Sequence, residues 1–209
     1  MSDYLQRPED LPTLRRRLAL RVLGLFGWKV YFKPLPGPHG IAVVYPHTSN
    51  WDFPIGLMAK WALDTPFSWL AKDSLFRGAM GGLMRYWGGI PIDRRAPMGA
   101  TRQLAQDMLK KDWCWVGITP EGTRSYRPNW KSGFYHLART ANVPLLLVSF
   151  DYKKKELCMT ETLELSGDIE RDMDAIRAVF EGVTARFPDN AAPIVLAPRD
   201  DTEKQRKRA

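Results

Sequence analysis

The sequence predicts an α/β fold, with a largely parallel sheet flanked by helices in a single domain that carries an N-terminal amphipathic helix. Two observations lead to this prediction. Apolar runs of strand length alternate along the chain with longer segments of helical periodicity, which is the pattern of a layered α/β protein. The 209 residues are 44% hydrophobic, which is enough for one domain with a core of ordinary size.

The expected elements follow one another as strand and helix from residue 29 onward. Loops that follow parallel strands meet at one edge of the sheet, where ligands collect, so the polar residues after each strand are the first candidates for a site. We expect strands at 29–32, 41–45, 67–71, 89–92, 113–118 and 143–151, with 155–165 as an edge or antiparallel strand. We expect helices at 51–63, 77–87, 98–110, 131–141 and 168–186.

The first helix is expected at residues 14–28. Apolar residues recur at helical spacing from Leu14 to Leu25, and three consecutive arginines lie near its start. The segment is too short and too charged to cross a bilayer, which requires about 20 apolar residues. It can lie among lipid headgroups with Phe26 and Trp28 dipping inward, or it can cover the domain's own sheet. Both arrangements can hold, one for each face of the helix.

The charge balance points to an anionic partner. The chain has 31 basic and 23 acidic residues, a formal net charge of +8. An anionic bilayer, a phosphorylated substrate and nucleic acid all fit this charge. Nucleic acid is disfavoured, because the basic residues concentrate at the two ends and no nucleic-acid-binding motif is present. The first residues are polar and acidic, so we expect no secretory signal peptide.

A histidine and an aspartate stand five residues apart where the strand 41–45 gives way to a helix. Ser49 or Asn50 is the natural N-cap, which leaves Asp52 in the first helical turn, where a negative charge is favoured. The Asp52 carboxylate can fold back onto one ring nitrogen of His47 and leave the other nitrogen to take a proton. A substrate hydroxyl would then be the nucleophile. The alternative is a loop histidine bonded to a helix cap.

A second polar loop follows the strand 113–118. Gly122 permits a tight turn, Thr123 adds a hydroxyl, and Arg124 offers a forked donor that suits phosphate. Glu121 can hold Arg124 in place or accept a hydrogen bond from a substrate hydroxyl. The alternative is a polar turn with a local ion pair.

Two further cations follow strands. Arg94 comes just after the strand 89–92, and Lys72 stands at the end of the strand 67–71, where each can meet an anion. For Arg94 the alternative is a solvated cluster of charges. With three histidines and no clustered cysteines, no metal ligand set is visible, and Cys114 is expected to be a structural thiol.

The order and spacing of these motifs resemble the four sequence blocks of the glycerophosphate and lysophospholipid acyltransferase family. Residues 47–52 match its His-x4-Asp block, and 89–94 resemble its second block. Residues 120–125 match the third block almost letter for letter, and 143–148 resemble the fourth, although Leu147 stands where the family often has a second proline. By this resemblance His47 would be the general base and Asp52 its orienting partner. The resemblance implies an acceptor site formed by Lys72, Arg94, Glu121, Gly122, Thr123 and Arg124.

The resemblance implies an enzyme that moves a fatty acyl group from acyl-CoA or acyl carrier protein to a lysophospholipid hydroxyl, such as that of 1-acyl-glycerol-3-phosphate. We expect this enzyme to need no cofactor or metal. We expect a peripheral protein on the cytoplasmic side of a membrane, with a membrane-surface segment at 1–33, the acyltransferase domain at 34–199 and a charged tail at 200–209. The alternatives are a non-catalytic protein that binds anionic lipids, an acyltransferase with a non-glycerol lipid acceptor, and a hydrolase that releases free fatty acid.

Overall fold

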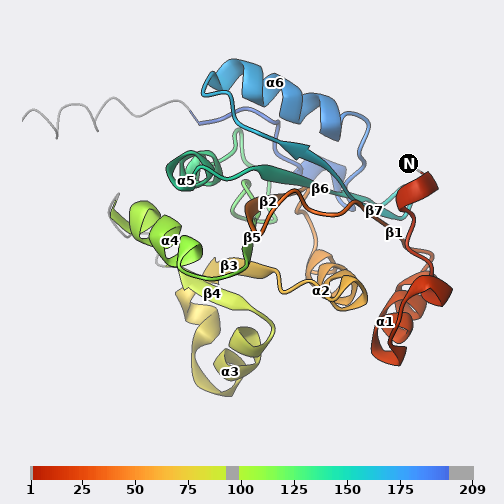
Figure 1. Ribbon diagram of the computed structural model, residues 1–209. Coiled ribbons are helices and arrows are strands. Elements are labelled where there is room, and N and C mark those ends of the chain that lie inside the picture. The colour runs from red at the N-terminus through yellow and green to blue at the C-terminus, as the bar shows by residue number, and fades with distance from the viewer. Residues whose placement is uncertain (1, 93–98, 198–209) are drawn as a thin grey trace, which may run out of the picture.

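The computed structural model describes residues 2–92 and 99–197. In these residues seven strands form one sheet, which Figure 1 shows with helices on its two sides. The strand order across the sheet is β1-β7-β6-β2-β5-β3-β4. The strands are β1 (Lys29–Phe32), β2 (His39–Tyr45), β3 (Ser68–Lys72), β4 (Gly89–Ile92), β5 (Cys114–Ile118), β6 (Leu145–Asp151) and β7 (Glu156–Leu163). The α-helices are α1 (Leu14–Leu25), α2 (Asp52–Leu63), α3 (Gly78–Tyr86), α4 (Gly99–Leu109), α5 (Gly133–Ala141) and α6 (Ile169–Phe180).

The predicted α/β fold with a largely parallel sheet is confirmed. Strands β6, β2, β5, β3 and β4 are parallel, so their carboxyl ends share one edge of the sheet, which we call the carboxyl edge. The β6–β7 pair is antiparallel. Strand β7 was expected to be an edge or antiparallel strand, and it is antiparallel but internal, because β1 pairs with its other side. Strand β1 therefore belongs to the sheet, although it falls within the predicted segment 1–33.

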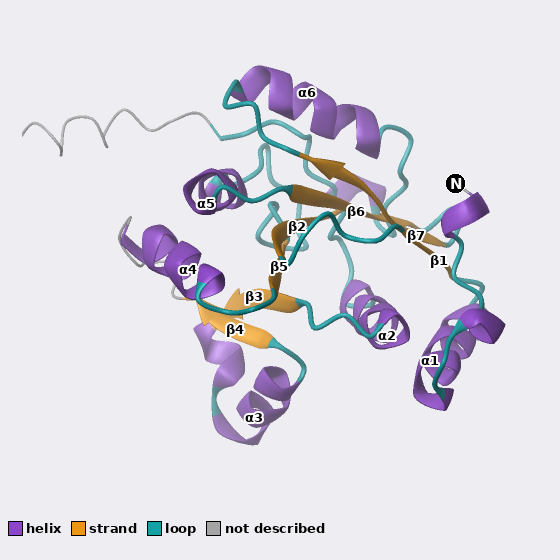
Figure 2. Cartoon of the chain, in the orientation of Figure 1, coloured by secondary structure: helices purple, strands orange, loops and turns teal. Residues whose placement is uncertain are grey.

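Both faces of the sheet are buried beneath helices (Figure 2). In β2, Ile41 and Val43 pack into the core beneath α4, α5 and α6, while Ala42 packs into the core beneath α1 and α2. Strand β6 alternates in the same way, with Leu145 on one face and Leu146 on the other. This two-sided burial explains why the central strands are continuous apolar runs with no polar face.

Helix α1 has a face that packs and a face that is exposed. Leu20 and Leu23 are buried against α2, and the Arg16 guanidinium donates to the carbonyl oxygens that end α2. Leu25 at the helix end is 84% exposed. Trp28 does not project outward as expected: it is buried, since its ring packs edge-on against Phe150 and Tyr152. None of the helices in residues 2–92 and 99–197 is long and apolar enough to cross a membrane.

The last helix is shorter than the sequence predicts. A helix was expected to residue 186, but α6 ends at Phe180, and Gly182 then adopts a left-handed conformation with φ +74°. Glu181 has already left the helical region, with ψ 131°, and the Val183 N–H donates to the Phe180 carbonyl at 3.2 Å, so a turn over residues 180–183 ends the helix. The chain from residue 181 to 192 turns back to the carboxyl edge, where its backbone reaches the loops after β2 and β5. The predicted tail at 200–209 lies outside the described residues.

Candidate active site

The loop between β2 and α2 brings His47 and Asp52 together. Asp52 is the first residue of α2, and Trp51, not Ser49 or Asn50, precedes the helix. Ser49 still serves the helix start, because its Oγ accepts from the Trp51 N–H at 3.1 Å. The Asp52 Oδ2 accepts in turn from the Ser49 N–H at 3.0 Å. The carboxylate is thus fixed by the turn from which the helix begins.

The expected contact between the two side chains is present. His47 Nδ1 lies 2.9 Å from Asp52 Oδ2, and the side chains are 18% and 3% exposed. Because a carboxylate only accepts, Nδ1 carries the proton, and Nε2 of the neutral ring keeps a free lone pair. The Nε2 atom makes no hydrogen bond to any residue that the structure describes. The ring is therefore oriented at one nitrogen and without a hydrogen bond at the other, an arrangement that general base chemistry requires.

Glu121 lies beneath this loop, not beside Arg124. The residue is 1% exposed; its Oε2 accepts from the His47 N–H at 2.6 Å and its Oε1 from the Ala192 N–H at 3.1 Å. Burial raises the pKa of Glu121, and the two N–H donors and His47 oppose that rise. Glu121 was expected to hold Arg124 or to accept from an acceptor hydroxyl. In the structure both of its carboxylate oxygens accept instead from backbone N–H groups in the interior.

The remaining residues of the loop after β5 face outward. Gly122 has a left-handed backbone, φ +67°, and a Cβ there would crowd the Lys131 side chain at 3.1 Å. The Thr123 Oγ1 accepts from the Ser125 N–H at 3.4 Å. Arg124 is exposed and bonds to no other described residue, so its guanidinium is available to an anion.

Lys72 ends β3 at the same carboxyl edge and is exposed. It makes no ion pair with another residue in the described ranges. Strand β3 lies two places from β2, so Lys72 stands about 10 Å across the sheet from the strand that leads to His47. Arg94, the other predicted cation, lies outside the described residues.

The sequence model of the Acyltransferase family matches residues 29–151, the segment that holds this geometry. The chain belongs to the acyltransferase family. Its fold is similar to the crystal structure of PlsC, the 1-acyl-sn-glycerophosphate (LPA) acyltransferase from Thermotoga maritima, with a TM-score of 0.54 and 20% identity. The match covers 82% of this chain and 79% of that chain. No curated protein matches the sequence. The family resemblance seen in the motifs is thereby confirmed, and this acyltransferase is an enzyme.

Two side chains at the site come from beyond the segment that matches the acyltransferase family. Tyr152 directly follows β6, and its hydroxyl donates to Asp52 Oδ1. Burial and the Asp52 carboxylate raise the pKa of this tyrosine. Arg186 places its guanidinium 5.8 Å from the centre of the Tyr152 ring, and the neighbouring Phe187 N–H donates to Thr48 Oγ1 at 3.2 Å. Neither Tyr152 nor Arg186 was predicted from the sequence; the signal available for Tyr152 was its place after a buried parallel strand.

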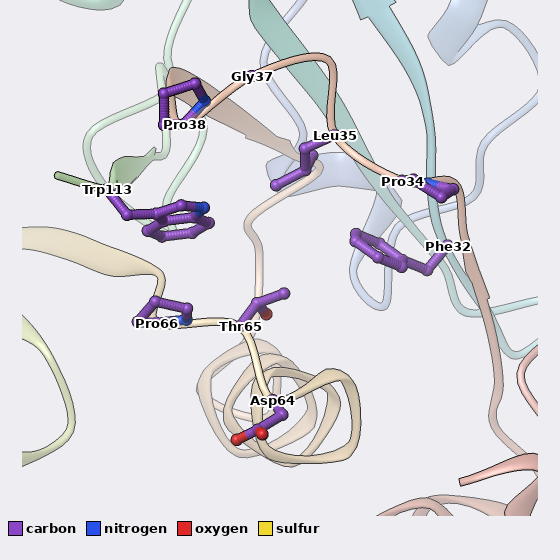
Figure 3. Close-up of a pocket in the computed structure, with 9 residues that line it drawn as sticks. All are labelled: Phe32, Pro34, Leu35, Gly37, Pro38, Asp64, Thr65, Pro66 and Trp113. Atoms are coloured by element: carbon purple, nitrogen blue, oxygen red, sulfur yellow. The ribbon is translucent and has the colours of Figure 1, made fainter.

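The acyltransferase also has an open cavity of about 460 Å³ at the opposite edge of the sheet (Figure 3). Pro38, Pro66 and Trp113 line it, and these residues come just before β2, β3 and β5. No predicted site residue lines this cavity, so it is separate from the His47 loop. Among the described residues, no three His, Cys, Asp or Glu side chains are grouped to hold a metal ion.

Proposed function

We propose that this acyltransferase moves a fatty acyl group from an acyl thioester to the hydroxyl of a lysophospholipid such as 1-acyl-glycerol-3-phosphate. The observation that carries the proposal is the oriented His47 ring, held at Nδ1 by Asp52 and open at Nε2, at the carboxyl edge of the sheet. Membership of the acyltransferase family and a fold like that of a 1-acyl-sn-glycerophosphate acyltransferase support it.

In the proposed reaction His47 Nε2 takes the proton of the acceptor hydroxyl as its oxygen attacks the thioester carbonyl. The new C–O bond forms an oxyanion, and backbone N–H groups or a nearby cation stabilise it. The C–S bond then breaks, and the thiolate of coenzyme A or acyl carrier protein receives the proton from the imidazolium. Asp52 stabilises the imidazolium while the proton resides on it. No acyl-enzyme forms.

Exposed cations at the carboxyl edge favour a phosphorylated acceptor. Arg124 and Lys72 are both exposed and make no ion pair with described residues, so both cations are available to bind a lipid phosphate. Thr123 and the backbone at Gly122 lie beside Arg124 and complete the proposed acceptor site. Arg94 is a further proposed member on the basis of the sequence alone.

Exposed apolar side chains support peripheral contact with an anionic membrane, in keeping with the proposed membrane-surface segment at 1–33, and the cytoplasmic side of that membrane is proposed on the basis of the sequence alone. Large apolar residues on or next to α1 and α3 are more than one-third exposed; α1 also carries four arginines, and α3 carries Arg85 and is preceded by Arg77. On α1 and just after it these are Leu14, Leu18, Leu25 and Phe26; on and before α3 they are Leu75, Met80, Leu83 and Tyr86.

The test is a matrix of donors and acceptors. Labelled acyl-CoA and acyl carrier protein are each offered with a panel of lysolipids in anionic vesicles, with His47→Ala as the background. We expect acylated product from a phosphorylated lysolipid with at least one donor, and none above background from the variant. Vesicle binding without any acylated product would overturn the proposal in favour of lipid binding alone. Free fatty acid as the sole product would overturn it in favour of a hydrolase.

A further inference from the structure

The Asp52 carboxylate is shared between two side chains. While Oδ2 faces His47 Nδ1, Oδ1 accepts from the Tyr152 hydroxyl. His47 lies close to Asp52 in the sequence, whereas Tyr152 is 100 residues away. Tyr152 reaches Asp52 because β6 pairs with β2 in the sheet. The carboxylate is therefore held at both oxygens.

The Tyr152 ring is itself fixed. Trp28 packs edge-on against it, with ring centres 5.0 Å apart at an interplanar angle of 89°. The guanidinium of Arg186 covers the ring at 5.8 Å from its centre. A ring packed on these contacts cannot turn away freely, so its hydroxyl remains directed at Asp52.

A hydroxyl in this place has two effects on the base. It fixes the rotation of the carboxylate, so that Oδ2 stays in line with Nδ1 and Nε2 keeps its direction toward the substrate. It also stabilises the carboxylate charge, which leaves less negative charge to stabilise a protonated imidazole. Both effects reach the reacting atoms only through Asp52.

We propose that Tyr152 is a positioning residue of the acyl-transfer site, which acts through Asp52 to set the orientation and the basicity of His47. This inference rests on the proposed function of His47 as the general base. It adds to the site a residue that lies one position beyond the segment matched by the family.

The direction of the pH effect follows from the charged groups that face this site. His47 is faced by the carboxylates of Asp52 and Glu121, and Tyr152 by Asp52 and Arg186. Removal of the Tyr152 hydroxyl takes one hydrogen bond from the Asp52 carboxylate. The carboxylate then stabilises the protonated His47 imidazole more strongly. Because the base must be neutral to take a proton, the acid limb of the kcat profile moves to higher pH.

The test is Tyr152→Phe, which keeps the ring between Trp28 and Arg186 and removes only the hydroxyl. We expect kcat for acyl transfer to fall about tenfold, as for a lost hydrogen bond to a charged group, with KM changed less than about twofold. We expect the acid limb to rise by about half to one pH unit. An unchanged kcat, or a fall in kcat without movement of the limb, would overturn the proposal.

Two further proteins separate positioning from packing. Tyr135→Phe removes a hydroxyl that donates to the buried Asp172 at 2.8 Å, far from the site, and we expect no change in kcat or in the pH profile. In a protein that already carries Asp52→Asn, Tyr152→Phe should cause no further fall, because residues that act through one another are not additive. A full tenfold fall in that background would contradict action through Asp52.

The two proposals fail in different ways. If the wild-type protein transfers no acyl group to any acceptor, the proposed function fails. If the wild type is active and Tyr152→Phe matches it in kcat and in the pH profile, only the role of Tyr152 fails.

Discussion

Among the described residues, two buried aspartates each accept a tyrosine hydroxyl, and their other partners separate the arrangement proposed for catalysis from a structural one. Around Asp172 every partner is a hydroxyl or a backbone N–H, and none is an imidazole: Oδ1 accepts from the backbone N–H and hydroxyl of Ser166, and Oδ2 from Tyr135 and the Gly167 N–H. We call Ser49, His47, Asp52 and Tyr152 the Asp52 cluster, and Tyr135, Ser166, Gly167 and Asp172 the Asp172 cluster.

The Asp52 cluster differs in one partner. One of its donors is the His47 imidazole, whose side chain is 18% exposed and whose other nitrogen makes no hydrogen bond to a described residue. A tyrosine–aspartate pair alone therefore does not indicate chemistry. What indicates chemistry is a titratable third partner with a free acceptor atom at the edge of the sheet where loops meet.

The largest expected effect tests the Asp52 cluster directly. His47→Ala removes the proposed base, and kcat for acyl transfer should fall by about three orders of magnitude, since general base catalysis contributes about 10²–10⁴. The matched control is His39→Ala. His39 begins the same strand at the opposite edge and bonds through Nε2 to the Lys111 carbonyl at 2.7 Å, so its variant should keep wild-type kcat. Equal loss in both variants would contradict the assignment.

The next effect tests whether the Asp172 cluster is structural. Asp172→Asn places an amide N–H₂ against hydrogen-bond donors and should lower the free energy of unfolding by about 2 kcal/mol, with kcat unchanged. Burial would raise the pKa of Asp172, but the donors from Ser166, Tyr135 and Gly167 outweigh it and lower the pKa.

A pH series sharpens that prediction. A carboxyl with a lowered pKa in the folded state contributes its full stabilisation above the pKa of the unfolded chain, about 3.9, and loses it as the pH falls through the folded pKa. The difference in unfolding free energy between wild type and Asp172→Asn should thus narrow below about pH 4. Urea unfolding at several pH values measures it, and a difference that widens in acid would contradict the account.

A smaller effect is expected at Glu121, whose carboxylate accepts from the backbone N–H of His47. In Glu121→Gln one amide oxygen must serve two backbone N–H groups, those of His47 and Ala192, so the loop is held less firmly. We expect kcat to fall about fivefold, the equivalent of one lost hydrogen bond of about 1 kcal/mol. Glu170→Gln, an exposed residue of α6, is the control for the loss of charge and should leave kcat unchanged. Equal kcat in the two variants would show that Glu121 does not support the base.

The smallest effect is expected at Arg124, an exposed residue of the proposed acceptor site. Arg124→Gln should raise KM for a phosphorylated lysolipid about two- to fivefold with little change in kcat, because an exposed ion pair contributes up to about 1 kcal/mol. Lys111→Gln removes an exposed cation just before β5, at the opposite edge, and should leave KM unchanged. A fall in kcat at constant KM would place Arg124 among the groups that act in the transition state instead.

The sequence was sufficient for features that depend on near neighbours. The central strands are continuous apolar runs because both faces of the sheet are covered by helices, so their positions could be predicted from the sequence. The contact between His47 and Asp52 spans five residues at the junction of a strand and a helix, so local geometry dictates it. The roles of these residues and of Gly122 and Arg124 remain predictions.

Features that depend on strand order were not readable. Tyr152 meets Asp52 only because β6 lies beside β2, and the alternation of strands and helices does not specify that order. Because Glu121 stands in a polar motif, the sequence predicted that it holds Arg124 or accepts a hydrogen bond from a substrate hydroxyl. Its burial depends on Ala192, from the segment that turns back after α6, where the sequence predicted more helix.

Asp52 is proposed to serve acyl transfer and Asp172 to stabilise the fold, and a comparison of Asp52→Asn with Asp172→Asn tests this difference. Both exchanges are of the same size and both remove one buried charge. Measured side by side for kcat with the best acceptor, Asp52→Asn should lose at least about a hundredfold, while Asp172→Asn keeps wild-type kcat and loses stability. If Asp52→Asn retained wild-type kcat, or if both variants lost activity equally, the assignment of the Asp52 cluster as the acyl-transfer site would be wrong.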